Sequence, residues 1–218
     1  MITRKGKYTV LFSDDIKILG YGAVVSQKEA QGPLGQEFDK ILYDPKAGQP
    51  TWEQAESFFQ QEALSIALSK SSLKAADIDY IFAGDLLNQC ISSSYGLKSF
   101  SIPYLGQYGA CSTMAQALIM ASVALESGAA RYSAAVTSSH FCSAERQYRF
   151  PLEYGGQRTP SAQWTVTGSG CCILGKNSDH KKFPAISAAT VGIITDLGIK
   201  DANNMGAAMA PVSVKLTP

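Results

Sequence analysis

The spacing of apolar residues alternates between two periods along the 218-residue chain. Short runs such as "KYTVLF", "IKILGYGAVVS" and "DYIFAG" are rich in β-branched and aromatic residues, which is typical of buried strands. From Thr51 to Lys70 the apolar residues instead recur at helical intervals, and Thr51 and Gln54 have the spacing of a capping box. The first third of the chain is therefore predicted to contain strands, a turn-rich loop and one long helix.

The same alternation continues to about residue 195. A helix is predicted over 92–99, and another from Cys111 to Gly128, with "RYSAAVTSSH" as a buried strand after it. "QWTVTGSGCCILGK" and "PAISAATVGIIT" predict a hairpin-like pair. Strands that alternate with helices favour one α/β domain over 1–218, with a mixed or mostly parallel sheet. The predicted Cys111 helix is rich in alanine, with Ala115, Ile119, Val123 and Ala124 on neighbouring turns.

Composition and charge exclude several classes of protein. The formal net charge is +1 and no run of lysine or arginine exceeds two residues, so the pattern argues against nucleic acid as a partner. The first twelve residues lack the features of a signal peptide, and "ALIMASVAL" is too short to cross a bilayer. These patterns predict a soluble, intracellular protein.

The cysteines and histidines do not form a recognisable metal or disulfide pattern. The chain has five cysteines, no CxxC motif, and two histidines, so neither a disulfide framework nor a zinc site is indicated. His140 and Cys142 are close in sequence, but two ligands do not make a metal site. We therefore expect no resident metal.

Cys111 comes at the start of a predicted helix. Free N–H groups and the helix dipole favour a thiolate at this position, which suits a nucleophile. Free cysteine is also among the most buried residue types, so a packing role is the alternative. Gly109, Ala110 and Ser112 are small and leave room beside the thiol for a ligand.

Polar residues follow two of the predicted strands. His140 ends one of them and Asp85 follows the other, and ligand sites collect at strand ends in α/β sheets. A hydrogen-bonded structural role is the alternative for His140, and capping of the next helix is the alternative for Asp85.

"ERQYR" contains two arginines three residues apart. On a helix Arg146 and Arg149 would share one face, and paired guanidinium groups suit a dicarboxylate or a phosphate. A solvated face with Glu145 as an internal partner is the alternative interpretation. "TGSG" lacks the spacing of a phosphate-binding loop and indicates close strand packing.

Several of these motifs together resemble a known family. "DIDYIFAGDLLNQ", "GACST", "AAVTSSH" and "TVTGSGCCILG" have the order and spacing of the N-terminal half of the thiolase superfamily. "GPLGQEFDK", "AERQYRFPLEYGGQRTP" and "NMGAAMAP" are similar, within that superfamily, to the stage V sporulation protein AD family. The resemblance implies a layered α/β thiolase-like fold and covers residues from about 20 to Pro211.

The resemblance also implies a function. Members of this family take part in uptake of dipicolinic acid, pyridine-2,6-dicarboxylate, into the developing spore, together with membrane protein subunits of the same operon. Cys111 falls on the thiolase nucleophile position, with Asp85, His140, Arg146 and Arg149 around the equivalent pocket. The arginines would then clamp the carboxylates, with Tyr148 or Tyr154 stacking on the ring. Asp85 would hold a water, a backbone donor, or calcium arriving with the ligand.

The end of the chain departs from the family pattern. "VSVKLTP" no longer follows it, and the C-terminal half that supplies the catalytic base in thiolases is expected to be mostly absent. We therefore expect a catalytically inactive dipicolinate-binding protein, cytoplasmic in the forespore or peripheral on the spore inner membrane. Self-association as a homodimer would cover the exposed sheet face. The alternatives are an acyltransferase that forms a thioester on Cys111, and a structural subunit that docks on a membrane complex.

Overall fold

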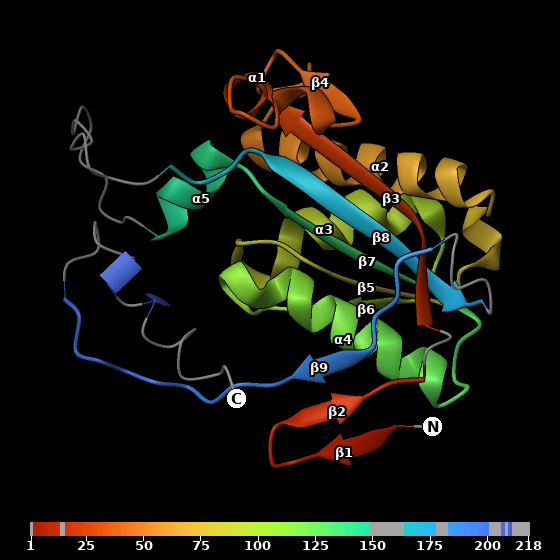
Figure 1. Cartoon of the computed structure of the whole chain (residues 1–218). Coiled ribbons are helices and arrows are strands. Elements are labelled where there is room, and N and C mark those ends of the chain that lie inside the picture. Colours follow the sequence, from red (N-terminus) through yellow and green to blue (C-terminus); the bar gives the residue numbers. More distant parts are fainter. Residues whose placement is uncertain are drawn as a thin grey trace.

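The computed structural model describes residues 2–13, 16–148, 164–177, 183–200, 206, 207, 209 and 210, without the side chains of 146–148. Two sheets, five α-helices and several short 3-10 turns make up this part of the chain (Figure 1). The strands are β1 Thr3–Lys5, β2 Thr9–Leu11, β3 Ile16–Ser26, β4 Lys40–Leu42, β5 Tyr80–Gly84, β6 Tyr104–Gly106, β7 Tyr132–Ser139, β8 Gly168–Lys176 and β9 Ala188–Thr190. The helices are α1 Gln27–Ala30, α2 Trp52–Ser71, α3 Ile91–Leu97, α4 Thr113–Glu126 and α5 Phe141–Tyr148.

The larger sheet has six strands in the order β4-β3-β8-β7-β5-β6. β8 runs antiparallel to both of its neighbours, and the remaining pairs are parallel. The prediction of an α/β protein with a mixed sheet is therefore confirmed. Figure 1 shows α2 on one face of this sheet and α4 on the other, so the domain has three layers.

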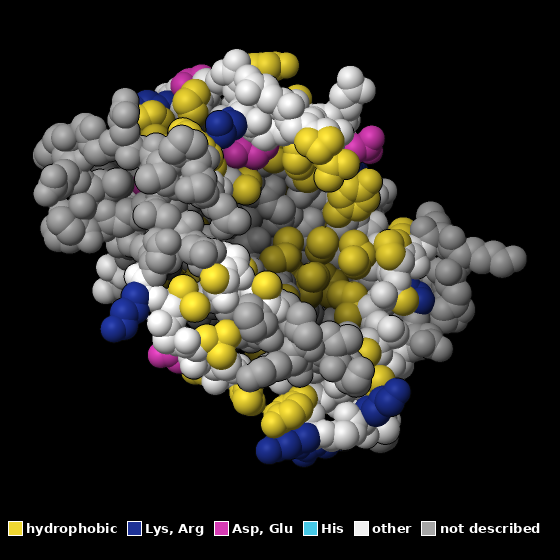
Figure 2. All heavy atoms as spheres, turned by 60° about the vertical axis from the view of Figure 1, so that its left-hand side comes forward, with side chains coloured by type: hydrophobic (Ala, Val, Ile, Leu, Met, Phe, Trp, Pro, Cys, Tyr) yellow, Lys and Arg dark blue, Asp and Glu magenta, His cyan; other side chains and the backbone are white. Residues whose placement is uncertain are grey.

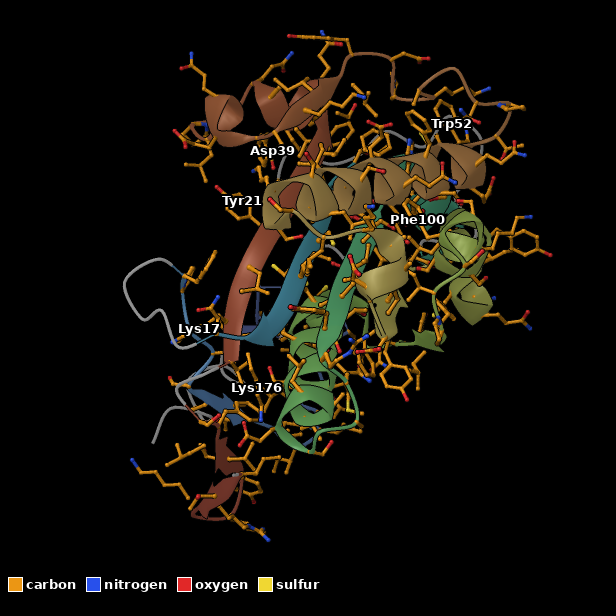
Figure 3. The ribbon with its side chains drawn as sticks, turned by 90° about the vertical axis from the view of Figure 1, so that its right-hand side faces the viewer. Lys17, Tyr21, Asp39, Trp52, Phe100 and Lys176 are labelled. Atoms are coloured by element: carbon orange, nitrogen blue, oxygen red, sulfur yellow. The ribbon has the colours of Figure 1, made fainter. Side chains whose placement is uncertain are left out.

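Helix α2 begins and ends close to the predicted positions. The Thr51 side chain accepts a hydrogen bond from the backbone N–H of Gln54 at 3.2 Å, as an N-cap does. At the other end the Lys70 ammonium bonds the Asp39 carboxylate and lies 3.8 Å from the centre of the Tyr21 ring. Figure 3 shows Trp52 at the first end of α2 and Tyr21 with Asp39 near the second. Both ends of α2 are thus fixed to neighbouring elements.

Helix α4 packs on the sheet through Ala117, Ala121 and Leu125. These residues are buried and form one core cluster with Phe82 of β5, Ala135 of β7 and Leu174 of β8. Ile119, Val123 and Ala124 are partly buried and pack against this cluster, whereas Ala115 is exposed. Because α4 is apolar on nearly all sides, the sequence pattern alone does not select its buried face.

The predicted hairpin does not form. β8 is the central strand between β3 and β7, whereas β9 pairs with β2 in a separate sheet of order β1-β2-β9. The prediction was wrong because two adjacent strand-like runs do not reveal their partners. The small sheet lies beside the C-terminal part of α4 (Figure 1).

The topology brings several strand ends to one edge of the large sheet. β3, β5, β6 and β7 all point the same way, so their carboxyl ends meet there. The first residue of β8 joins them, and α4 begins at the same edge. Such an edge is where α/β proteins bind ligands.

In the described part of the chain, no helix combines the length and apolar character needed to cross a bilayer.

Candidate functional site

A cavity of about 920 Å³ lies at this edge of the sheet. Its volume is in the range of small-molecule binding sites. Its walls come from the ends of β3, β7 and β8, the start of α4, α5, and the segment that precedes β8. Figure 2 shows hydrophobic side chains gathered in a hollow of the face it presents. The lining residues include Asp85, Cys111, Met114, Ser138, Glu145 and Trp164.

Cys111 lies in a single 3-10 turn, Ala110–Ser112, immediately before α4. The turn is closed by the Ser112 hydroxyl, which donates to the Gly109 carbonyl at 2.7 Å, and by the Thr113 hydroxyl, which donates to the Ala110 carbonyl at 2.8 Å. Ala110 has φ of 48°, a backbone conformation that costs a non-glycine residue about 1 kcal/mol. The exposed thiol of Cys111 lines the cavity, so the expectation that Cys111 merely packs in the core does not hold.

Asp85 also lines the cavity, and it is only 1% exposed. One carboxylate oxygen accepts from the backbone N–H of Leu87 at 2.8 Å. The other accepts from the N–H and the hydroxyl of Ser93, at 2.7 and 2.6 Å. Asp85 therefore caps the first turn of α3, which agrees with one of its two predicted roles, and it also borders the cavity.

Two residues that the sequence interpretation did not assign to the site complete the described wall. Glu145 of α5 is 5% exposed and accepts a hydrogen bond from the Thr165 hydroxyl at 3.1 Å. Trp164 stacks on Phe141 with ring centres 4.5 Å apart, and the Lys28 ammonium lies 4.1 Å from the centre of its ring. The tryptophan just before "TVTGSG" was the available signal, because tryptophan is large, amphipathic and enriched at interfaces.

His140 is placed away from the cavity lining. It is 1% exposed, packs against the Trp52 ring with centres 5.2 Å apart, and donates from Nε2 to the Pro45 carbonyl at 2.8 Å. Its Nδ1 accepts from the backbone N–H of Cys142 at 3.2 Å. Burial lowers the pKa of His140, which favours the neutral ring. This geometry matches the structural interpretation of His140, not the ligand-binding one.

The two predicted arginines are only partly covered by the structure. Arg146 is part of α5, next to the cavity-lining Glu145, and its side chain lies outside the described residues. Arg149 and Tyr154 lie outside the described residues altogether, and so does the side chain of Tyr148. Among the described lining residues there are two carboxylates and no lysine, arginine or histidine.

A chain of buried polar groups lies directly behind this wall. The Ser93 hydroxyl that donates to Asp85 accepts from Gln60 Nε2 at 2.9 Å, and the same nitrogen donates to the Ser138 hydroxyl at 2.6 Å. The Ser138 and Ser143 hydroxyls donate to the two oxygens of Glu56 at 2.8 and 2.9 Å. Asp85 and Glu56 are therefore linked through three side chains, and sequence periodicity had given no sign of it.

Glu56 has an unusual electrostatic environment. Its side chain is fully buried on α2. Burial raises the pKa of Glu56 to about 7, and the negative charge of Asp85 acts in the same direction, while the serine hydrogen bonds oppose the shift.

No group of three or more metal-binding side chains is found in the described part of the chain.

The three-layered fold of α2, the large sheet and α4 is thiolase-like. A family model described as "Stage V sporulation protein AD (SpoVAD)" matches residues 6–217, and the chain belongs to this family. The stage V sporulation protein AD of Bacillus subtilis (strain 168) is 42% identical over 208 residues, which cover 95% of this chain. The chain spans 61% of the length of that relative.

Solved structures of other proteins share this fold. Xanthomonas campestris OleA with bound cerulenin superimposes with a TM-score of 0.63 at 13% identity, over 94% of this chain and 70% of its own. The 3-oxoacyl-[acyl-carrier-protein] synthase III of Aquifex aeolicus VF5 gives 0.53 at 14% identity, over 75% and 55%. At these identities the likeness confirms the thiolase-like fold alone.

Proposed function

We propose that this sporulation protein binds dipicolinate in the cavity beside Cys111 and does not turn over an acyl substrate. Family membership supports this proposal, and the observation that carries it is the cavity itself. Cys111, Asp85 and Trp164 meet there at the carboxyl edge of the sheet. Its size suits a small molecule such as a substituted pyridine.

The charged groups of the described cavity wall do not by themselves favour an anionic ligand. Dipicolinate is a dianion, and the described wall brings Asp85 and Glu145 with no cation. The balancing charge must therefore come from outside the described wall, and Arg146 and Arg149 are the nearest arginines in sequence to Glu145. Guanidinium groups bind carboxylates in a bidentate manner, which suits this role. Calcium that arrives with the ligand is the other source of positive charge in the proposal.

Calorimetric titration of the 218-residue chain with dipicolinate, with and without calcium, tests the proposal. We expect saturable binding, and we expect Arg146→Ala to weaken it at least about tenfold, because one charge-assisted bond to a carboxylate is worth about 1.5–3 kcal/mol. Lys200→Ala, which removes a cation outside the cavity, is the matched control and should bind like the wild type. Absence of binding under both conditions would refute the proposal.

The acyltransferase alternative predicts a different result at Cys111. Such an enzyme transfers an acyl group from coenzyme A to the Cys111 sulfur, which releases free coenzyme A. Cys111 is exposed, but no histidine lines the described cavity wall to accept its proton. Intact mass spectrometry after incubation with acyl-coenzyme A should therefore show no added acyl mass. A stable adduct that Cys111→Ser abolishes would favour the alternative.

A further inference from the structure

The buried carboxylate of Glu56 lies behind the cavity wall with no described cation beside it. Both of its oxygens accept hydrogen bonds from serine hydroxyls, Ser138 and Ser143, and Ser138 is also a lining residue of the cavity. A hydroxyl stabilises a buried negative charge far less than a guanidinium or ammonium group does. The negative charge of ionised Glu56 is therefore poorly stabilised by its surroundings, next to the cavity.

The elements packed on α2 supply few groups that act on Glu56. Asp85, which follows β5, is the charged group whose field reaches it, and it carries the same sign. His140, after β7, is directed to Pro45 and Trp52. The other titratable residues on those elements are Lys17 and Tyr21 of β3, Tyr95 of α3, Tyr132 of β7, Cys142, Glu145, Arg146 and Tyr148 of α5, and Cys171, Cys172 and Lys176 of β8.

Gln60 allows the chain of hydrogen bonds to reverse. Its Oε1 atom is buried, and no described residue donates to it. When Glu56 carries a proton, it donates to the Ser138 oxygen, and the Ser138 hydroxyl then needs a new acceptor. Rotation of the Gln60 amide can supply Oε1 for that purpose, at the cost of the two hydrogen bonds that Nε2 donates to Ser93 and Ser138. The protonated state can therefore be accommodated without leaving the Ser138 hydrogen unpaired.

We infer that Glu56 takes up a proton when an anionic ligand enters the cavity, so that dipicolinate binding is coupled to protonation behind the wall. The inference rests on the proposed function. An anion beside Asp85 adds a further negative charge to a poorly solvated region. Protonation of Glu56 relieves this accumulation of negative charge, because its carboxylate is fully buried and accepts hydrogen bonds from serine hydroxyls with no described cation beside it. By linkage, binding must then weaken as the pH rises.

Calorimetry in two buffers of different ionisation enthalpy, phosphate and Tris, measures the protons taken up per dipicolinate bound. Between about pH 7 and 8.5 we expect a clear net uptake by the wild type, with an affinity that falls by up to about tenfold per pH unit. Glu56→Gln should bind dipicolinate without taking up this proton, and its affinity should change little with pH. Glu62→Gln, on the same helix but in a surface ion pair with Lys40, is the matched control and should behave like the wild type.

The possible results separate the two proposals. Binding with no proton uptake by the wild type overturns the coupling and leaves the proposed function standing, whether or not the Glu56 variant folds. Binding with equal uptake by the wild type and Glu56→Gln assigns the proton to another group and also overturns it. No binding by the wild type overturns both proposals.

Discussion

Replacing Gly22 with alanine is expected to lower the free energy of unfolding by about 3 kcal/mol or more. Gly22 lies in β3, directly under α2, and a Cβ atom at this position would be 2.1 Å from the carbonyl oxygen of Ala63. That oxygen belongs to the helix backbone, so it cannot move aside as a side chain does. The helix or the strand must shift, and the core between them opens. Urea unfolding followed by circular dichroism measures the change.

Gly170→Ala is the matched control for this prediction. Gly170 lies in the adjacent strand β8, and a Cβ atom there would meet only the terminal methyl group of Met114, at 3.3 Å. This methyl group ends a flexible side chain, so the change in stability should be less than about 1 kcal/mol. If Gly22→Ala were as stable as Gly170→Ala, α2 would not be pressed against β3 as the structure describes.

The parts of the fold that were predicted correctly have strong local signals. The Thr51 cap and the apolar period after it fix the start of α2, and Gly128, with φ of 79°, follows the end of α4. Local chemistry of this kind does not depend on what lies across the chain. Pairing between distant strands does, and for that reason the predicted hairpin of β8 and β9 failed while both strands exist.

The candidate site was likewise only partly predictable from the sequence. Cys111 and Asp85 were predicted from their positions after strands, and the sheet topology brings both to one cavity. His140 also follows a strand, but its side chain is not among the described lining residues of the cavity. Its ring donates a hydrogen bond to the Pro45 carbonyl and packs against the Trp52 ring instead. Glu56 could not be found in this way, since a glutamate within an amphipathic helix normally faces solvent. Only the tertiary structure shows that this one is buried and linked to Asp85 through Ser138, Gln60 and Ser93.

The burial of Glu56 also has a consequence for stability that needs no ligand. In the unfolded chain its pKa is near the ordinary 4.5, and in the folded protein it is about 7. The folded state therefore binds more protons between these two values, so the contribution of Glu56 is most favourable below pH 4.5 and is lost as the pH rises through 7. The whole shift corresponds to about 3 kcal/mol.

Glu56→Gln removes this titration and should flatten the pH dependence of stability. The difference in unfolding free energy between the variant and the wild type should move in favour of the variant by up to about 3 kcal/mol from about pH 4.5 to 8.5. Taking the difference cancels the opposite trend from His140, whose lowered pKa makes the fold more stable as the pH rises toward neutrality. Urea unfolding of both proteins across this range makes the measurement, with Glu62→Gln expected to follow the wild type. A constant difference would mean that the pKa of Glu56 is the same in the folded and unfolded chains. The inferred uptake of a proton by Glu56 on ligand binding would then have no basis.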